Sequence, residues 1–261
     1  MQIDTPTRLM IAGLVFVVFA LWEVYWPQRQ SIFSRSRRWS GNLGLFVADL
    51  LLIGIPLQGI ALGTVVLAET NSFGLMNWLQ LPWALKAVIG FLALDAMFYF
   101  QHRLSHAVPL LWRLHRVHHA DTEMDVSTAN RVHPLESLWL TFLRVVLAVS
   151  LGIPLLVLIG FQIALNIVSL FNHANIELPA SVDRVIRRVF VTPNMHETHH
   201  SAHTEDYDTN FSFIFSFWDR VFRTYKRAST PVDGIVRLGL DEFRSEQDAS
   251  LGRLLLQPFR N

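Results

Sequence analysis

Histidine is the residue type in this chain whose spacing points most directly to chemistry. All eleven histidines follow residue 101, and eight of them fall into three short motifs. HRLSH has two histidines four residues apart, whereas HRVHH and HETHH share the spacing H-x-x-H-H. Residues three and four apart lie on one face of a helix, so we expect each motif to direct its imidazoles at one point. The eight residues are His102, His106, His115, His118, His119, His196, His199 and His200.

Imidazoles in this number predict a site for two metal ions. A catalytic zinc ion takes only three protein ligands, so the eight histidines exceed what one ion needs. Neutral nitrogen ligands favour iron, copper or zinc over magnesium or calcium. The chain has no cysteine, which excludes disulfides, thiolate ligands and iron–sulfur clusters. A redox-inert metal would support hydrolysis, whereas iron would support oxidation by O₂.

The third motif also has a hydrolytic interpretation. MHETHHSAH contains His196-Glu197-x-x-His200, which is the signature of zinc metalloproteases with the glutamate as general base. That interpretation leaves the histidines of the other two motifs without a role, and we expect Glu197 to be replaceable. A metal transporter or sensor is a further alternative, but the first two apolar segments have too few polar residues to form a path.

Four charged residues lie within or beside the apolar segments. Asp95 is seven residues before His102 on the same helical face, where it either orients an imidazole or is satisfied within a helix bundle. Glu23 and Asp49 are expected to be structural, close to the site. Arg144 either extends to the membrane surface or contacts a polar headgroup.

The elements that must position the histidines are transmembrane helices. Hydrophobic residues make up 51% of the chain and charged residues 16%, with a mean hydropathy of +0.32, which excludes an ordinary soluble domain. A basic stripe that would bind nucleic acid is missing. The expected spans are 9–26, 43–68 with a kink near Gly54 and Pro56, and 83–101, followed by a helical hairpin over 138–171 that is broken near Gly152 and Pro154.

Loop charges predict the orientation of these helices. The loop between the first two spans holds Arg29, Arg35, Arg37 and Arg38, whereas residues 69–82 contain no lysine or arginine. The positive-inside rule makes the arginine loop cytoplasmic, so the third helix delivers the histidines to the cytoplasmic face. A small-residue cleavage site does not follow the first span, which predicts a retained helix rather than a signal peptide.

The motifs as a set resemble the fatty acid hydroxylase / sterol desaturase superfamily of membrane di-iron oxygenases, in particular its bacterial sterol-desaturase-type members. The resemblance rests on the order HxxxH, HxxHH, HxxHH and covers about residues 95–225, half of the chain. It extends to DAMFYFQHRLSH, LWRLHRVHHADTEMDVSTANRVHPLE, NHANIELP, VTPNMHETHHS and FWDRVFRTY. It agrees with an all-α fold, an integral membrane helical bundle with a cytoplasmic histidine-rich di-metal cap.

The resemblance adds two lone histidines to the eight motif ligands. A lone histidine is by default a hydrogen-bonded buried side chain, although a position near a membrane favours function. His173 in NHAN and His133 in RVHPLE match family positions and would make a site of ten histidines. His203 lies in a polar stretch outside the motifs and is not included, and Glu197 occupies a position that the family leaves variable.

The resemblance also implies a reaction and its partners. Two iron ions, for which zinc can substitute in purified protein, would use O₂ as co-substrate to hydroxylate or desaturate a C–H bond of a sterol, fatty acyl or related lipid. Electrons would come from a separate donor: cytochrome b5, a ferredoxin with its reductase, or a reduced pterin. We expect one domain in the bacterial inner membrane, with transmembrane helices over 1–94, a catalytic core over 95–226 and a tail over 227–261.

Overall fold

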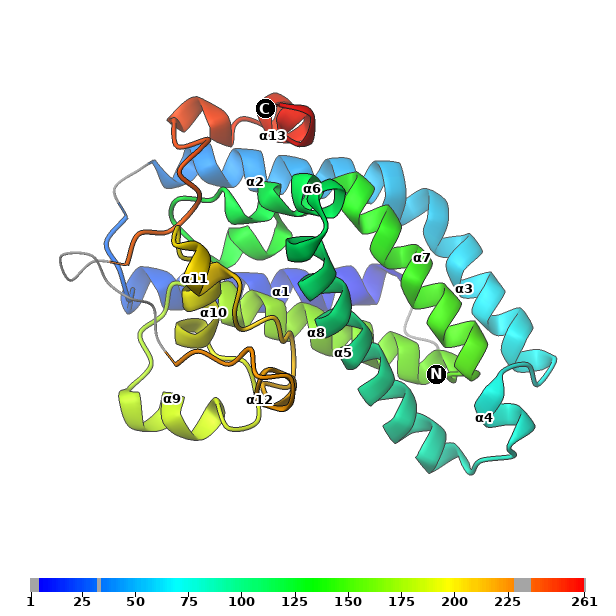
Figure 1. Cartoon of the computed structure of the whole chain (residues 1–261). Helices are drawn as coiled ribbons and strands as arrows, with labels where there is room; N and C mark the ends of the chain where they lie inside the picture. Colours follow the sequence, from blue (N-terminus) through cyan, green and yellow to red (C-terminus); the bar gives the residue numbers. More distant parts are fainter. Residues whose placement is uncertain (1–4, 32–33, 228–235, 261) are drawn as a thin grey trace.

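The chain folds into a bundle of long helices with an assembly of short helices at one end (Figure 1). The computed structural model describes residues 5–31, 34–227 and 236–260. Within these ranges only isolated β-bridges occur and no strand forms, which confirms the predicted all-α fold. The helices are α1 (Thr5–Tyr25), α2 (Arg35–Asp49), η1 (Leu50–Gly54), α3 (Ile55–Thr70), α4 (Leu75–Trp78), α5 (Trp83–Ala107), α6 (Pro109–His119), η2 (Val126–Asn130), α7 (Pro134–Leu151), α8 (Leu155–His173), α9 (Ala180–Ile186), α10 (Pro193–His199), α11 (Thr204–Tyr207), α12 (Phe217–Val221), η3 (Glu246–Ala249), α13 (Leu251–Leu256) and η4 (Gln257–Phe259).

Within the described residues, four helical stretches are long and apolar enough to cross a membrane, whereas the apolar part of α1, Met10–Tyr25, is shorter. Many large apolar side chains on α1, α3 and α7 are exposed, as in a protein surrounded by lipid. The chain is therefore a multi-pass membrane protein, as its composition predicts. The four stretches are Arg35–Trp78, Trp83–Ala107, Pro134–Leu151 and Leu155–His173.

The second predicted span is longer than its apolar core suggests. α2 begins at Arg35 and continues through the π-helical turn η1 into α3, so that the two form one bent helix in Figure 1. Pro56 lacks an amide hydrogen, and its ring would clash with the carbonyl four residues earlier in a regular α-helix. The wider π turn directly before Pro56 accommodates this ring. The interruption lies where Gly54 and Pro56 predict it.

A tight turn separates α7 from α8 and confirms the break predicted near Gly152 and Pro154. Gly152 caps α7 in the left-handed conformation, with φ of 72°. A Cβ atom at this position would lie 2.6 Å from Asn77 Nδ2 and 2.8 Å from the carbonyl oxygen of Phe73, so only glycine fits. The turn returns α8 alongside the bundle, and α8 ends at the histidines.

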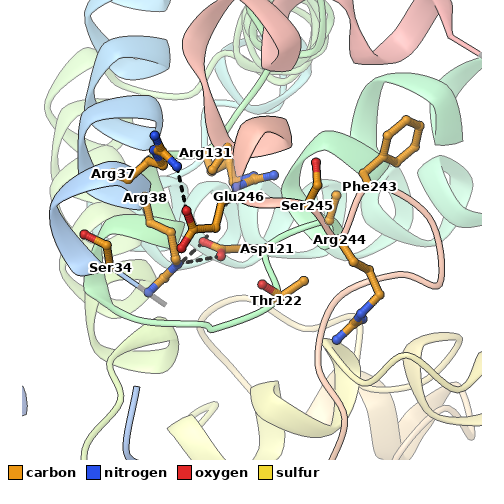
Figure 2. A pocket seen from close by; sticks show the side chains of 12 residues that line it. Ser34, Arg37, Arg38, Asp121, Thr122, Arg131, Phe243, Arg244, Ser245 and Glu246 are labelled. Atoms are coloured by element: carbon orange, nitrogen blue, oxygen red, sulfur yellow. Dashed lines mark hydrogen bonds and ion pairs between the residues drawn. The ribbon is translucent and has the colours of Figure 1, made fainter. Parts of the chain in front are cut away.

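A buried ion network joins α2 to the loop after α6 (Figure 2). The Arg38 guanidinium lies 3.0 Å from the Asp121 carboxylate. Burial disfavours the charge of Asp121, but Arg38 and Arg131 hold the pKa of this carboxyl well below its usual range. On the surface, Arg37 pairs with Glu246 at 2.6 Å and ties the C-terminal segment to α2. The network therefore fixes the C-terminal end of α6, which holds the second histidine motif.

The C-terminal segment also packs against the bundle through apolar contacts. Leu254 on α13 is fully buried together with Leu45 on α2 and Val117 on α6. A second apolar core joins the long helices to the segment that precedes α12, because Phe98 and Phe161 pack with Ile214. The finer division into helices, core and tail stays a prediction.

Candidate metal centre

The structure brings together nine of the ten predicted histidines from four parts of the chain. α5 contributes two, α6 three, the last residue of α8 one, and α10 with its C-terminal cap three. These segments meet where α5 and α8 end, beside the short helices (Figure 1). The nine side chains are almost completely removed from solvent. They are His102, His106, His115, His118, His119, His173, His196, His199 and His200.

α10 is a short helix that other residues hold in place. Helices of seven residues are marginal in isolation, so this one depends on its ends and its packing. Pro193 occupies the first turn, where its missing amide hydrogen costs nothing. The Thr192 hydroxyl accepts a hydrogen bond from the Met195 amide at 3.4 Å, and Asn210 Nδ2 donates to the Met195 carbonyl at 3.0 Å. These contacts fix the third histidine motif relative to the loop after α11.

The nine histidines form two groups, and each H-x-x-H-H motif contributes to both. Within each group, one ligand nitrogen per residue lies within 4.8 Å of all the others. The expectation that one motif points at a single place is therefore wrong. Residues i and i+4 are offset by about 40° around a helix, whereas i+3 and i+4 are about 100° apart, so the middle histidine turns to the other group. The first group is His102, His106, His115, His119 and His199, and the second is His118, His173, His196 and His200.

The first group presents lone pairs to its centre. Backbone carbonyls and carboxylates accept hydrogen bonds from four of the five Nδ1 atoms, which places the ring proton of those four on Nδ1 and leaves their Nε2 as an acceptor. His119 Nδ1 has no hydrogen-bond partner within the described residues. All five Nε2 atoms are buried and have no hydrogen-bond partner within the described part of the chain. The Nδ1 contacts are His102 to Phe211 O at 2.8 Å, His106 to Asp208 Oδ1 at 3.2 Å, His115 to Glu136 Oε1 at 2.7 Å, and His199 to Thr209 O at 2.7 Å.

The second group is more tightly convergent. The Nε2 atom of His173 lies 3.0 Å from that of His118 and 2.9 Å from that of His196, and the latter is 3.2 Å from Nε2 of His200. Nitrogen ligands about 2.1 Å from a metal ion lie roughly 3.0–3.4 Å from each other in octahedral or tetrahedral geometry. The spacing of the second group, like the unpartnered nitrogens of the first, fits a bound metal ion.

Five imidazoles outside the membrane-spanning helices, those of His118, His119, His196, His199 and His200, are neutral at physiological pH. Burial, followed by the proximity of other imidazoles, lowers the pKa of His118, His119, His196 and His200 well below the usual value. Burial likewise lowers the pKa of His199 to about 3. Neutral imidazole is the form that coordinates a metal ion.

Two sequence-predicted residues lie outside both groups. His133 caps the start of α7, where its Nδ1 accepts a hydrogen bond from the Leu135 amide at 3.2 Å and its Nε2 faces the Leu255 carbonyl at 3.2 Å. Both ring nitrogens are thus engaged away from the groups, and His133 differs from the other nine. Asp95 accepts hydrogen bonds from the Phe215 amide at 3.2 Å and from Trp218 Nε1 at 2.8 Å, so it anchors the segment before α12 rather than an imidazole.

Glu197 points away from the histidines. Its carboxylate forms an ion pair with Arg29 and accepts a hydrogen bond from Gln28 Nε2 at 2.6 Å. The two histidines of the H-E-x-x-H reading lie in the second group with His118 and His173. The glutamate therefore links α10 to the loop after α1, and the geometry matches the histidine-triplet reading of MHETHHSAH.

The comparison with known families follows the same part of the chain. The family model described as fatty acid hydroxylase matches residues 87–224, which contain both histidine groups. The chain belongs to the fatty acid hydroxylase family. The predicted resemblance is confirmed over more than half of the chain.

Characterised members of the family are similar to the chain at moderate identity. The ornithine lipid hydroxylase OlsE of Rhizobium tropici is 25% identical over 188 residues, which cover 72% of this chain and 55% of that protein. The alkylglycerol monooxygenase of Danio rerio is 28% identical over 160 residues, 60% of this chain and 34% of that protein. Human (Homo sapiens) cholesterol 25-hydroxylase is 27% identical over 141 residues, 54% of this chain and 51% of that protein. The chain thus spans between a third and just over half of these relatives, and no solved structure matches it.

Next to the second group, this member of the fatty acid hydroxylase family has a cavity of about 300 Å³. Its wall includes His115, His118 and His173 together with apolar side chains such as Phe98 and Leu140. The cavity lies among α2, α5, α7 and α8. It provides space beside the histidines for part of an apolar molecule.

Sequence reasoning missed the acceptors that orient the imidazoles. Glu136 is nearly fully buried, and its Oε1 atom accepts the hydrogen bond from His115 Nδ1. The Asp208 carboxylate and the backbone carbonyls of Thr209 and Phe211 accept hydrogen bonds from three further histidines. They lie in a loop that contains no recognisable sequence motif. Such partners usually hold a ligating histidine in one tautomer and orientation. Glu136 lies within RVHPLE, so the sequence identifies its motif but not its hydrogen bond with His115.

Proposed function

We propose that the chain is a membrane-bound non-haem di-iron monooxygenase that hydroxylates a C–H bond of a lipid. The observation that carries this proposal is the convergence of nine buried imidazoles into two groups beside a largely apolar cavity in a membrane bundle. Relatives named for hydroxylation of an ornithine lipid and of cholesterol, and for monooxygenation of alkylglycerol, support hydroxylation over desaturation. The substrate would be a lipid that enters from the bilayer.

The residues of the chain hold the metal ions and control what reaches them. Five and four imidazoles would ligate one iron ion each, and the bound irons would supply reductive activation of O₂, with one oxygen atom entering the product and the other leaving as water. The carbonyl and carboxylate acceptors hold the rings in the ligating tautomer. Burial of the site excludes water, which protects the reaction from side products.

The electron supply and the orientation are part of the same proposal. The chain has no cysteine for an iron–sulfur cluster, so electrons would come from a separate donor such as cytochrome b5, a ferredoxin with its reductase, or a reduced pterin. The arginines at 29, 35, 37 and 38 support a cytoplasmic position for the histidine end. We assign the protein to the bacterial inner membrane.

Metal analysis and lipid profiling together test the proposal. Protein purified anaerobically from iron-replete cells is expected to hold about two irons per chain, because the nine imidazoles divide into two sites. Cells that express the chain are expected to accumulate an oxygenated lipid that is absent with an inactive His118→Ala variant. An unchanged lipid profile together with a single zinc ion per chain would contradict it. Zinc in both sites of protein purified in air would be substitution, which iron reconstitution reverses.

Replacing Glu197 separates the oxygenase from the metalloprotease alternative. Glu197→Gln removes the ion pair with Arg29, which is partly exposed, and keeps an oxygen that accepts from Gln28. Because the Glu197 side chain is largely buried, losing the pair should cost some stability. The pair lies outside both histidine groups, so lipid oxidation should stay within about fivefold of the wild type with iron retained. Arg29→Gln is the matched control because it breaks the same pair from the other side. Loss of all activity in Glu197→Gln alone, with metal retained, would indicate a general base and support a protease.

A further inference from the structure

A second cavity, of about 280 Å³, adjoins the cavity at the histidines. It lies farther along α3 and α8 from the histidine end and is lined mainly by apolar residues of α1, α3 and α8, among them Ile11, Leu57 and Ile163. Six residues belong to the linings of both cavities, and all six are polar, although the helices that carry them are mainly apolar. We call these six residues the polar collar: Asp49, Ser137, Thr141, Arg144, Gln162 and Asn166.

The polar collar follows helical periodicity toward the metal centre. Ser137, Thr141 and Arg144 lie four and then three residues apart and so share one face of α7. Gln162 and Asn166 share a face of α8 whose next members, at 169 and 173, line the cavity at the histidines. Polar residues inside membrane helices are costly, and their arrangement along two facing helices indicates a function.

Two hydrogen-bond acceptors in the polar collar lack donors within the described residues. Ser137 Oγ donates to Asp49 Oδ2 at 3.1 Å, and Arg144 Nη2 donates to Thr141 Oγ1 at 3.2 Å. Asp49 Oδ1 and Asn166 Oδ1 are nevertheless buried without a hydrogen-bond partner within the described residues. A buried acceptor without a donor is unfavourable, and a ligand that brings an N–H or O–H group would remove this cost.

The charges of the polar collar narrow the ligand further. Asp49 and Arg144 carry opposite charges, so the collar has no net charge to attract an ion. A carboxylate would lie near Asp49 and would offer no hydrogen to either acceptor. A pure hydrocarbon would leave both acceptors unsatisfied. An uncharged group that donates a hydrogen bond fits, because Asp49 Oδ1 and Asn166 Oδ1 can accept its hydrogen.

We infer that the polar collar binds an uncharged hydrogen-bond-donating group of the lipid substrate, a hydroxyl or an amide N–H. This inference rests on the proposed lipid hydroxylation and names the class of lipid. The polar collar anchors that group between the two cavities, and the second cavity, farther from the histidines, holds an apolar part of the lipid. The number of bonds between the anchored group and the histidines then determines which carbon is oxidised.

Binding of matched probes to the full chain in detergent tests the inference without turnover. Tritiated hexadecan-1-ol is displaced by unlabelled hexadecan-1-ol, its methyl ether, hexadecanamide, N,N-dimethylhexadecanamide and palmitate. The alcohol or the amide, or both, should bind about tenfold more tightly than its methylated counterpart and than palmitate. The reason is that only the unmethylated probe donates a hydrogen bond to the unpartnered carboxylate oxygen of Asp49 or amide oxygen of Asn166. The tighter of the two pairs identifies hydroxyl or amide as the anchor. Equal binding within both pairs would overturn the inference.

A variant distinguishes hydrogen bonding from the extra size of a methyl group. Asn166→Leu keeps a similar volume and removes one unpartnered acceptor, so the preference for the donor probe should fall to about twofold or less. Thr64→Val is the control, because Thr64 is an exposed polar residue of α3 that lines neither cavity. A preference that persists in Asn166→Leu would overturn the inference. The result is independent of lipid oxidation, since failure to oxidise any lipid would refute the proposed function and leave the binding preference intact.

Discussion

Replacing His196 with alanine is expected to abolish lipid oxidation and to reduce bound iron from about two to about one per chain. His196 Nε2 lies 2.9 Å from that of His173 and 3.2 Å from that of His200, so its loss removes a central member of a four-histidine group. Loss of a residue that only orients a ligand typically costs 10–100-fold in affinity or activity, and loss of a ligand should cost more than about a hundredfold. Iron quantification and product formation measure the two effects.

The reciprocal replacement, His199→Ala, should deplete the other iron, because His199 belongs to the five-histidine group. His133→Ala provides the matched control, since it removes a buried histidine whose ring nitrogens face Leu135 and Leu255 instead. This control should keep about two irons and most of the activity, with some loss of stability from the α7 cap. If His133→Ala loses iron as His196→Ala does, the nine-histidine assignment is wrong and the ten-histidine prediction holds.

Periodicity explains why the sequence predicts so much of this site. The histidines of α5, α6 and α10 repeat at helical spacing, and that spacing alone places them on shared faces. Their division into two groups depends on where the helices lie relative to one another. His115 and His119 face one group while His118 faces the other, which spacing by itself does not reveal. The sequence therefore reveals which histidines are candidates for a metal site, whereas the fold determines which of them share a metal ion.

The helix boundaries show the same contrast. The break between α7 and α8 is predictable because Gly152 and Pro154 have strong local preferences. The start of α2 at Arg35 is not predictable in this way, because its first residues are polar and pair with residues remote in sequence. Arg37, for example, pairs with Glu246. His133 had a local signal as well. It precedes Pro134 at the start of α7, a position where a side chain caps a helix.

Replacing Glu136 with alanine is expected to weaken iron binding and lipid oxidation by about 10–100-fold, the range found for carboxylates that orient metal-bound histidines. Its Oε1 atom accepts the hydrogen bond from His115 Nδ1 at 2.7 Å, and its Oε2 atom is buried without a partner within the described residues. Without this acceptor the His115 ring is free to rotate and to move its proton to Nε2, the atom that faces the first group. The rate at which a chelator removes iron measures the loss of affinity separately from turnover.

Glu136→Gln separates orientation from charge. The amide oxygen of glutamine still accepts the hydrogen from His115 Nδ1, so the ligating tautomer is preserved while the negative charge is lost. If orientation is the main contribution, Glu136→Gln should restore most of the iron retention that Glu136→Ala loses, to within about tenfold of the wild type. Equal iron loss in the two variants would instead assign the contribution to the charge of Glu136. Unchanged iron retention in both would contradict any role of Glu136 at the metal centre, because a residue that merely packs against the cavity leaves the first group intact.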